Sequence, residues 1–543
     1  MSDAVGAEAA AADFPHEFAE PDHAALDWEW DDMHMPFALT PLAADYVLTL
    51  AGGFNEPYER LGHPVRVYAA VWNGYAYFAG QPNASEDERK VNRERFDANC
   101  RARAEVTADY WANEAIPELR SLYRRVDDVD PEATDRDEIA DGWLDAWAAT
   151  LRAWEIHFWS ILGPYQVVED LADLYESTIG DAATGEALRL VQGFSPDLYD
   201  VAVELDGVTE LATRHPEVAA RLRIEPQATL DELALLPGGR AFVERILHFL
   251  DHHGHLGQAF DDLGQPSYAE EPRLLLAEIG KRLERPAQSA EARRTALHVE
   301  ADRLADAARV RLAERPDELV KFEHLLALGR EIGHLTEGHN YWIDRMAQAK
   351  LRGLALRMGR RLVRDDAFGD PEDVLFLGRD EVAALIRSPH DVRSLIAERR
   401  ETHRHRLGVR PPKNLGTRDM GAARPDRFEG TRVESTEANV LRGTGASQGI
   451  IRGPARVAVS NADFPRIRPG DIIVCPSSNP SWVPVFTVAG GLVTNTGGVL
   501  SHAAVVAREF ALPAVVGVAD ATRTIRDGQI IEIDGTLGTV RLL

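Results

Sequence analysis

The sequence predicts a multidomain protein in which a mostly α-helical region is followed by a small carboxy-terminal α/β domain. The chain has 543 residues, which is room for about two to four domains of ordinary size. Apolar residues recur at spacings of three and four within residues 21–405, a pattern typical of amphipathic helices. Short β-rich runs separated by glycine and proline take over from residue 437. Because 45% of the residues are apolar and 27% are charged, the composition is that of a globular chain.

The charge and the cysteine content exclude several classes of protein. The chain carries 60 Lys and Arg against 88 Asp and Glu, a formal net charge of −28, which disfavours a broad contact with nucleic-acid phosphates. Cys100 and Cys475 are far apart and form no Cys-x-x-Cys pair, so we expect no disulfide framework and a reducing compartment. The amino terminus has no basic start, and no run of about 18 apolar residues occurs. The sequence therefore predicts a soluble, cytoplasmic protein with no nucleic-acid partner and no membrane partner.

Local patterns within the helical region predict individual elements. Asn73-Gly74 stands between apolar, aromatic runs, which predicts a β-hairpin over residues 65–79. Further on, a helical stripe of apolar residues is formed by Leu297, Ala301, Leu304, Ala308 and Leu312. Pro316 then marks the start of a second long helix, which we expect to run towards Gly359.

Two segments lack the periodicity of a folded element. Residues 1–20 are rich in alanine and acidic residues, which predicts a flexible tail. Residues 406–436 hold three prolines and four glycines with little apolar periodicity, which predicts an extended linker. The segment 437–543 has the size of a small domain. Its β-rich runs lie at residues 455–459, 472–475, 492–494, 514–516 and 530–533, with one short helix near 501–510.

One strand–turn–helix segment of this domain has the composition of a phosphate site. The strand at 492–494 leads to Gly497-Gly498, and glycines allow a close approach of the backbone to a bound group. We expect Ser501 to cap the Ala-rich helix that follows, which places His502 in a first turn that favours anions. Imidazole is a competent nucleophile, so His502 is a candidate carrier of a phosphoryl group. The alternative is a structural strand–turn–helix with a surface histidine.

An ordered set of motifs extends over residues 441–543. It comprises Gly445-Ala446-Ser447-Gln448-Gly449, Asn479-Pro480-Ser481-Trp482-Val483-Pro484, the segment Gly497–Glu509 and Pro513-Ala514-Val515-Val516-Gly517. This set resembles the mobile, phosphohistidine-carrying swivelling domain of phosphoenolpyruvate-utilising enzymes, a superfamily that includes phosphoenolpyruvate synthase and pyruvate phosphate dikinase. The resemblance implies that residues 437–543 form a swivelling phosphohistidine domain with His502 as its catalytic residue. The residues that it implies for phosphate binding are Thr496, Gly497, Gly498, Ser501 and Arg508.

The front of the chain carries shorter motifs. They are Trp28-Glu29-Trp30-Asp31-Asp32-Met33-His34, the segments 249–255 and 337–344, and Asp370-Pro371-Glu372-Asp373-Val374-Leu375-Phe376-Leu377. These motifs resemble the acceptor-binding region of rifampicin phosphotransferase and the corresponding part of phenylphosphate synthase, which implies that residues 21–405 bind an acceptor. No segment resembles a Walker A motif or the ATP-grasp half of phosphoenolpyruvate synthase. We therefore expect no cofactor bound directly by this chain, and a separate ATP-grasp subunit that uses ATP and Mg²⁺.

Polar residues are candidates for an acceptor pocket. A spacing of 4-3-4-3-4 predicts that six of them lie along one helix face, namely Arg330, His334, Glu337, Tyr341, Asp344 and Gln348. The residues assigned to the pocket are His255, Glu337, His339, Tyr341 and Asp344. Glu337, Asp344 or a neutral His339 would act as the general base, and a solvated or domain-interface face is the alternative. The histidines at 248, 252, 253 and 255 have no Cys or His-Glu-x-x-His companion, so we expect no metal site.

Together these features predict a phosphotransferase, or its catalytic subunit, of the dikinase type with a phosphohistidine intermediate. His502 would receive the phosphoryl group from the ATP-grasp subunit and pass it to a hydroxyl of a small acceptor. The phenol and rifampicin precedents of the family, with Trp28, Trp30, Tyr341 and Trp342 in this chain, favour an aromatic acceptor. The alternative is a phosphohistidine carrier or regulatory protein without acceptor chemistry of its own. A pocket at the polar stripe would favour the enzyme.

Overall fold

The structure of the chain is a computed structural model. It describes residues 14–32, 34–82, 86–179, 186–224, 228–257, 263–284, 289–416, 439–459, 461–477, 483–486 and 488–543. Most of the predicted tail, the predicted linker from residue 417 onward and most of the motif at 479–484 lie outside these described residues. The chain forms two compact units, and the helical region contributes to both. The first unit comprises residues 1–163, 260–265 and 342–423, and the second comprises residues 164–259, 266–341 and 424–543.

A four-stranded sheet of order β2-β3-β1-β4 organises the described part of the first unit. Strands β2 (Val65–Trp72) and β3 (Tyr75–Pro82) pair antiparallel through the two-residue turn Asn73-Gly74. Both turn residues have positive φ, 48° and 84°, as a turn that matches the twist of the hairpin requires. The predicted hairpin is confirmed. Strand β1 (Trp28–Trp30) pairs with β3 and with β4 (Asn414–Leu415).

Helices of the first unit pack closely where their side chains are small. Helix α2 (Pro41–Leu61) begins after Thr40, whose hydroxyl accepts the Ala43 N–H at 3.4 Å. Its buried Gly53 lies against Trp154 of α6 (Arg136–Thr178), a 43-residue helix whose first part belongs to this unit. The remaining helices are α3 (Glu86–Ala104), α4 (Thr107–Tyr110), α5 (Ile116–Asp127), α16 (Met346–Arg364), α17 (Arg379–Arg387) and α18 (Arg393–Arg406), with shorter turns η1 (Pro21–Ala25), η2 (Trp111–Ala115) and η5 (Pro371–Phe376).

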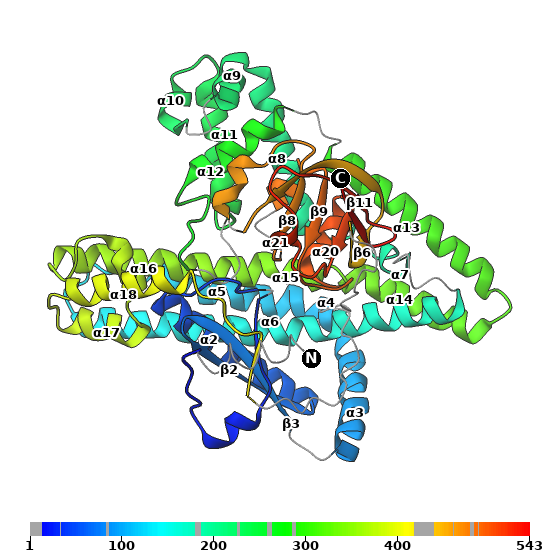
Figure 1. Cartoon of the computed structure of the whole chain (residues 1–543), viewed down its shortest axis with the longest axis horizontal. Coiled ribbons are helices and arrows are strands. Elements are labelled where there is room, and N and C mark those ends of the chain that lie inside the picture. The colour runs from blue at the N-terminus through cyan, green and yellow to red at the C-terminus, as the bar shows by residue number, and fades with distance from the viewer. Residues whose placement is uncertain are drawn as a thin grey trace. The chain divides into compact units, whose positions relative to one another are not determined.

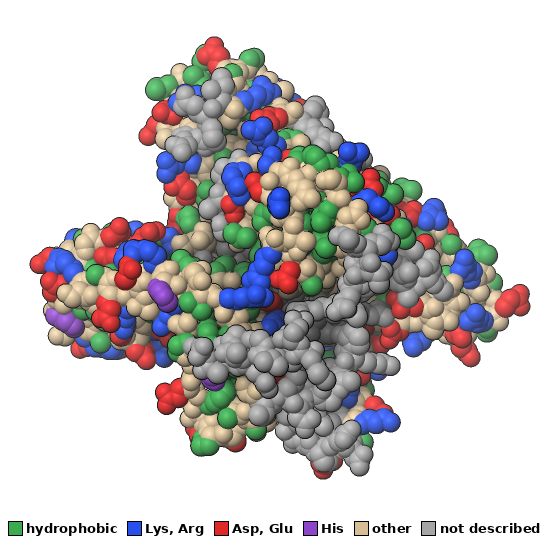
Figure 2. All heavy atoms as spheres, viewed as in Figure 1, with side chains coloured by type: hydrophobic (Ala, Val, Ile, Leu, Met, Phe, Trp, Pro, Cys, Tyr) green, Lys and Arg blue, Asp and Glu red, His purple; other side chains and the backbone are tan. Residues whose placement is uncertain are grey.

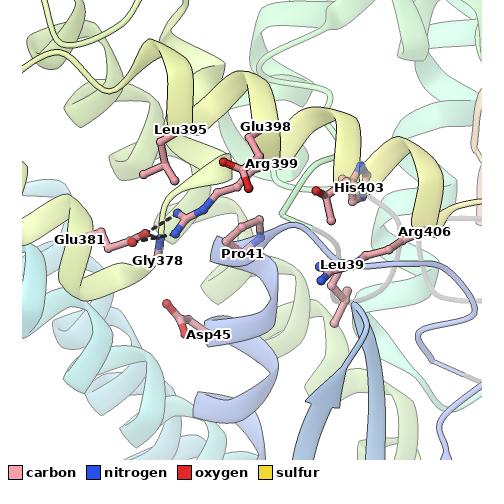
Figure 3. Close-up of a pocket in the computed structure, with 11 residues that line it drawn as sticks. Leu39, Pro41, Asp45, Gly378, Glu381, Leu395, Glu398, Arg399, His403 and Arg406 are labelled. Atoms are coloured by element: carbon pink, nitrogen blue, oxygen red, sulfur yellow. Dashed lines mark hydrogen bonds and ion pairs between the residues drawn. The ribbon is translucent and has the colours of Figure 1, made fainter. Parts of the chain in front are cut away.

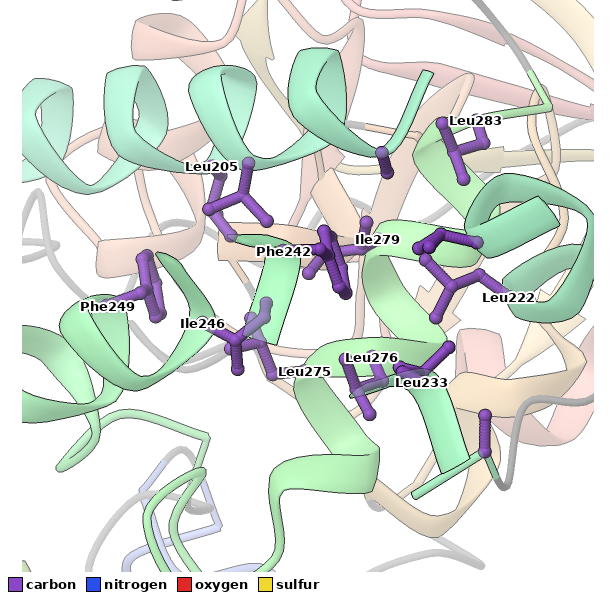
Figure 4. Close-up of a cluster of buried hydrophobic side chains, with 14 of the residues drawn as sticks. Leu205, Leu222, Leu233, Phe242, Ile246, Phe249, Leu275, Leu276, Ile279 and Leu283 are labelled. Carbon is purple, nitrogen blue, oxygen red and sulfur yellow. The ribbon is translucent and has the colours of Figure 1, made fainter. Parts of the chain in front are cut away.

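The helical part of the second unit has its own apolar core. Figure 4 shows one cluster of buried apolar side chains that includes Phe242, Ile246 and Phe249 of α11 and Leu276 and Ile279 of α12. All five side chains are at most 1% exposed, so this cluster excludes water. The helices of this part are α7 (Glu186–Arg189), α8 (Pro196–Arg214), α9 (Pro216–Ile224), α10 (Leu230–Ala234), α11 (Gly239–His253), α12 (Pro272–Arg282), α13 (Ala290–Leu312), α14 (Pro316–Ile332) and α15 (Leu335–Asn340).

The structure confirms one of the two long helices predicted from the sequence and contradicts the other. The stripe from Leu297 to Leu312 lies in α13, and that helix is confirmed. The prediction of one helix running from Pro316 towards Gly359 was wrong. The chain instead forms α14, a turn at residues 333–334, α15, a π-helical turn η4 (Tyr341–Arg345) and α16. Because a π turn inserts one extra residue, the 4-3-4-3-4 spacing does not keep six side chains on one face.

The carboxy-terminal part of the second unit, orange to red in Figure 1, holds a sheet of strands. Among the described residues this sheet has eight strands, of order β5-β12-β11-β7-β8-β9-β10-β6. Strands β7, β8, β9 and β10 run parallel to one another, and the other pairs are antiparallel. The strands are β5 (Val440–Arg442), β6 (Thr444–Ser447), β7 (Ile450–Val457), β8 (Ile472–Cys475), β9 (Gly491–Thr494), β10 (Ala514–Val516), β11 (Ile530–Asp534) and β12 (Thr539–Leu542). The helical turns between them are η6 (Asn461–Arg466), α19 (Val483–Phe486), α20 (His502–Glu509) and α21 (Ala521–Thr524).

Both faces of this sheet are covered. Along β8, Ile473 and Cys475 belong to one apolar cluster, whereas Ile472 and Val474 belong to another. This alternation follows from the period of two in a strand, and two buried faces explain why the run is apolar throughout. The predicted fold class, a mostly helical region followed by a carboxy-terminal sheet domain, is confirmed at this level. The short strands β5, β6 and β12 were not predicted.

Charged side chains lie on the surface of the described residues, as expected from the composition. On the face shown in Figure 2, acidic and basic side chains are intermingled over the described elements. Cys100 and Cys475 are both buried. Within the described residues, no helix combines the length and the hydrophobicity that crossing a bilayer requires.

Candidate active site around His502

The loop before α20 is shaped by one glycine and by side chains that bind its backbone. Gly497 has φ +104°, and a Cβ there would lie 2.7 Å from Ser501 Oγ, so only glycine fits without strain. The Thr496 hydroxyl donates to the Pro476 carbonyl at 3.2 Å. Asn495 exchanges two hydrogen bonds with Thr522, at 2.8 and 2.9 Å. The turn is therefore held in place from the neighbouring strand and from α21.

Ser501 does not cap α20 in the predicted way. It occupies the N-cap position, yet its side chain accepts no hydrogen bond from the helix. The hydroxyl instead donates to the Gly498 carbonyl at 2.8 Å. Because Oγ is occupied as a donor within the loop, Ser501 stabilises the glycine turn and leaves the first N–H groups of α20 uncapped by its side chain.

The imidazole of His502 contacts a carboxylate far away in the sequence. Its Nδ1 is hydrogen-bonded to Oε2 of Glu337, a residue of α15 that is 6% exposed. The same Oε2 accepts a hydrogen bond from Asn340 Nδ2 at 3.1 Å. A carboxylate only accepts, so Nδ1 carries the hydrogen, and the lone pair of the neutral ring is on Nε2. Nε2 is buried and has no hydrogen-bond partner among the described residues.

Arg508 lies beside this pair. It is buried, its Nη1 donates to the Ala446 carbonyl at 3.2 Å, and its charge interacts with Glu509 and Glu337. Burial lowers the pKa of Arg508 to about 10, and the two carboxylates oppose that shift. The guanidinium is therefore still protonated at neutral pH. It balances the negative charge of Glu337 next to His502.

Glu509, the last residue of α20, is a further buried carboxylate that the sequence reasoning did not single out as a site residue. It accepts hydrogen bonds from the Gly193 N–H and from the Tyr199 hydroxyl. Burial raises its pKa, against the lowering effect of these two hydrogen bonds. Its position next to Arg508 in the motif was the only signal in the sequence that could have indicated it.

The other predicted pocket residues of the second unit are His255, His339 and Tyr341. The Tyr341 hydroxyl donates to the His252 carbonyl at 3.0 Å and accepts from His253 Nδ1 at 2.8 Å. The ring of His255 meets the Tyr341 ring edge-on, with centroids 4.5 Å apart. His339 Nδ1 donates to the Leu335 carbonyl of its own helix at 2.5 Å. The structure thus brings Tyr341 to His255, and Glu337 to His502.

Asp344 and Trp28 belong to the first unit. Asp344 is fully buried, and its Oδ1 lies 2.9 Å from His157 Nδ1. Trp28 is 2% exposed within the aromatic core of the four-stranded sheet, where its ring centroid lies 4.8 Å from that of Trp72. The tryptophan therefore serves the core of the sheet.

A cavity of about 550 Å³ lies in the described part of the first unit, between the start of α2 and helices α17 and α18 (Figure 3). Glu381 and Arg399 pair across it with N–O distances of 2.5 and 2.8 Å. None of the predicted acceptor-pocket residues lines it. The lining residues are Leu39, Pro41, Asp45, Gly378, Glu381, Leu395, Glu398, Arg399, Thr402, His403 and Arg406.

Two family models match the chain. Residues 467–538 match the mobile domain of PEP-utilising enzymes, and residues 158–337 match the fourth domain of rifampicin phosphotransferase. His502 and Glu337 each lie within one of these two matched segments. The resemblance to PEP-utilising enzymes and to rifampicin phosphotransferase that the motifs predicted is confirmed by these two matches.

Of three individual relatives, two are named phosphotransferases. The chain is 32% identical to a rifampicin phosphotransferase of a Streptomyces species, over 69% of this chain and 43% of that protein. It is 26% identical to the uncharacterised phosphotransferase YvkC of Bacillus subtilis, over 78% of this chain and 51% of the relative. It is also 30% identical to chondramide synthase of Chondromyces crocatus, over 98% of this chain and 14% of that protein. The chain thus spans about half or less of the length of these relatives.

Proposed function

We propose that this chain is a phosphotransferase, or the catalytic subunit of one, that carries a phosphoryl group on Nε2 of His502 and transfers it to a hydroxyl of a small acceptor. The observation that carries this proposal is the contact between His502 Nδ1 and Glu337, which leaves Nε2 as the nucleophilic nitrogen. The match of the surrounding segment to the PEP-utilising mobile domain supports it.

In the first half-reaction, a separate ATP-grasp subunit holding ATP and Mg²⁺ phosphorylates His502. The Nε2 lone pair forms a P–N bond to the β-phosphorus of ATP while the bond from that phosphorus to the AMP oxygen breaks, and water releases the γ-phosphate. His502, ATP and one water thus give phosphohistidine, AMP and phosphate. When phosphorylated His502 docks again, the hydrogen bond from Nδ1–H to Glu337 stabilises the positive charge of the ring. The glycine turn at 497–498 and the start of α20 supply N–H groups and a helix dipole for the phosphoryl oxygens.

In the second half-reaction, the acceptor oxygen attacks phosphorus while the P–N bond breaks and its electron pair returns to Nε2. His502 leaves as a neutral imidazole that keeps its Nδ1 hydrogen. The hydroxyl proton of the acceptor passes to water, because Glu337 is bound to Nδ1 and faces away from the Nε2–P bond. Charge is conserved in this step, since a phosphoimidazolium, an alcohol and water give an imidazole, a phosphate ester and a hydronium ion.

We propose an aromatic hydroxyl compound as the acceptor. The paired rings of Tyr341 and His255 offer an aromatic surface in the same unit as Glu337. Relatives at about 30% identity are named rifampicin phosphotransferases. Both observations favour a ring-bearing acceptor over a small aliphatic one.

The test is phosphoryl transfer to the purified chain from ATP labelled at the β or γ position, with and without an ATP-grasp protein of the same host. We expect acid-labile label from the β position only when the partner is present, and none in His502→Ala. No label in any mixture would refute the proposal. A labelled chain is then mixed with phenols and aliphatic alcohols. Release of label as an aryl phosphate is expected, and label that stays on the chain with every acceptor would favour the carrier alternative.

A further inference from the structure

We infer that Glu509 is a positioning residue that docks α20 into a socket formed by Gly193 and Tyr199, and so controls whether His502 is held against Glu337 or free to meet a donor. The inference rests on the proposed function for its purpose, since release of His502 matters only if it is phosphorylated. Glu509 touches no reacting atom and acts through the helix that carries His502.

The contact itself is a buried, charge-assisted cluster. The Glu509 carboxylate accepts the Gly193 N–H at 3.1 and 3.2 Å, one distance to each oxygen, and the Tyr199 hydroxyl at 3.0 Å. Glu509 is 7% exposed and Tyr199 is 5% exposed. Hydrogen bonds to a buried charge are stronger than hydrogen bonds between neutral groups. Breaking them would leave a buried charge without hydrogen-bond partners.

The socket is held in place from the helical side. Gly193 has φ +82°, a conformation that favours glycine, and its carbonyl accepts from His298 Nε2 at 2.7 Å and from Arg294 Nε at 3.2 Å. A Cβ at residue 193 would lie 2.8 Å from the His298 ring. Two groups of α13 thus fix the peptide whose N–H points at Glu509. Such a peptide loses little entropy when the helix docks.

The two ends of α20 are held by the same helical part. His502 is the first residue of the helix and Glu509 the last, and a separation of seven residues places both on one face, about 10 Å apart along the axis. Glu337 holds one end and the socket of Gly193 and Tyr199 holds the other. If one of these two contacts is lost, α20 can rotate about the contact that remains.

Docking also hides the reactive nitrogen. In the docked arrangement His502 Nε2 is buried among the described residues, so a donor cannot reach it until α20 separates from the helical part. A change that destabilises only the docked state lowers the equilibrium constant for docking. The ratio of accessible to docked chains then rises by the same factor as this constant falls. Glu509 therefore sets the fraction of time for which His502 is open to phosphorylation.

The test uses phosphoramidate, a small reagent that phosphorylates imidazole without an enzyme. The initial rate of His502 phosphorylation is followed by mass spectrometry in the full chain. We expect Glu509→Gln, which keeps the shape and removes the charge, to react at least about threefold faster than wild type, and Tyr199→Phe to show a smaller increase. The control is Glu532→Gln, a carboxylate of strand β11 outside the socket, which should react like wild type.

Two results would overturn the inference. One is wild-type reactivity in both socket variants. The other is a native chain in which His502 already reacts as fast as in the urea-unfolded chain. If Glu509→Gln loses its near-UV circular dichroism, Tyr199→Phe carries the test, since it removes one hydroxyl only. Failure of labelling from ATP would refute the proposed function but not this inference, because phosphoramidate needs no donor protein.

Discussion

At the scale of single residues, the chemistry of His502 is set by the group that holds its Nδ1. A carboxylate that accepts from Nδ1–H fixes the tautomer and orients the ring, and in the proposed mechanism it stabilises the cation formed when Nε2 binds phosphorus. Asn340 donates to the same oxygen of Glu337, so the carboxylate is itself oriented. Arg508 supplies a nearby positive charge that offsets the cost of burying Glu337.

The pair gives a direct prediction for Glu337. Glu337→Gln keeps the size of the side chain but removes the charge that stabilises a phosphoimidazolium. We expect phosphorylated His502 to pass its phosphoryl group to the acceptor roughly tenfold to hundredfold more slowly, a barrier increase of about 1.4–2.7 kcal/mol, because imidazole leaves phosphorus more readily when a carboxylate holds its Nδ1 hydrogen. Glu331→Gln is the matched control, because Glu331 is an exposed carboxylate of the neighbouring helix α14. Equal transfer rates in wild type and Glu337→Gln would remove Glu337 from the mechanism.

The sequence identified individual site residues more successfully than it identified the residues that they contact. His502 was singled out by its motif and Glu337 by helical spacing, but the two are 165 positions apart, and no local pattern joins them. Ser501 was correctly placed at the start of the helix. Its hydroxyl was assigned the wrong partner, because propensity says nothing of a competing carbonyl in the loop. Glu509 was missed as a site residue, since its socket lies on a distant helical segment.

At the scale of elements, the first unit depends on how closely α2 approaches α6. Buried Gly53 faces the backbone of α6, where an added Cβ would lie 2.7 Å from Trp154 Cβ and 2.8 Å from its carbonyl carbon. Exposed Gly52 faces only the flexible end of Leu151, at 3.1 Å. Glycine is therefore required at the first position, where backbone atoms cannot move aside.

These neighbouring glycines form a matched pair. We expect Gly53→Ala to destabilise the chain by about 1–3 kcal/mol through overpacking. Gly52→Ala should be neutral or stabilising by up to about 1 kcal/mol, because alanine has the higher helix propensity. The measurement is the thermal midpoint of the two variants against wild type. A similar decrease in both variants would show that helix propensity, and not the approach of α6, governs this site.

The elements that were predicted from the sequence are those whose signals are local. The hairpin at Asn73-Gly74 and helix α13 follow from turn chemistry and from a continuous apolar stripe. The segment from Pro316 was predicted as one helix because polar residues repeat through it. The pattern of polar residues does not indicate the π turn at Tyr341–Arg345. Strands β5, β6 and β12 are only three or four residues long, so alternation alone could not identify them.

At the scale of the whole molecule, the carboxy-terminal sheet is structurally self-contained. Every strand of the eight-stranded sheet comes from residues 440–542, and the apolar clusters on its two faces draw on the same segment. The helical region, by contrast, contributes to both units, and α6 runs from one to the other. Composition changes sharply at residue 437 but not within α6, so no feature of the sequence marked the division between residues 163 and 164.

This self-containment predicts that the fragment 439–543 folds without the rest of the chain. We expect a cooperative thermal transition and the circular dichroism of a mixed α/β domain, since all strand pairings and both apolar clusters are retained. Glu337 is absent from this fragment, so its His502 should react with phosphoramidate faster than in the full chain. A broad, non-cooperative transition would contradict the prediction.

The matched control is the shorter fragment 467–538, the segment that the mobile-domain model matches. It keeps β8, β9, β10 and β11 but lacks β7, which pairs with both β8 and β11. It also lacks β12, so β11 loses both of its hydrogen-bonded neighbours and the apolar cluster beneath it is opened. We therefore expect this fragment to remain unfolded. If it folds as stably as 439–543, the outer strands add no stability and the domain is smaller than the sheet.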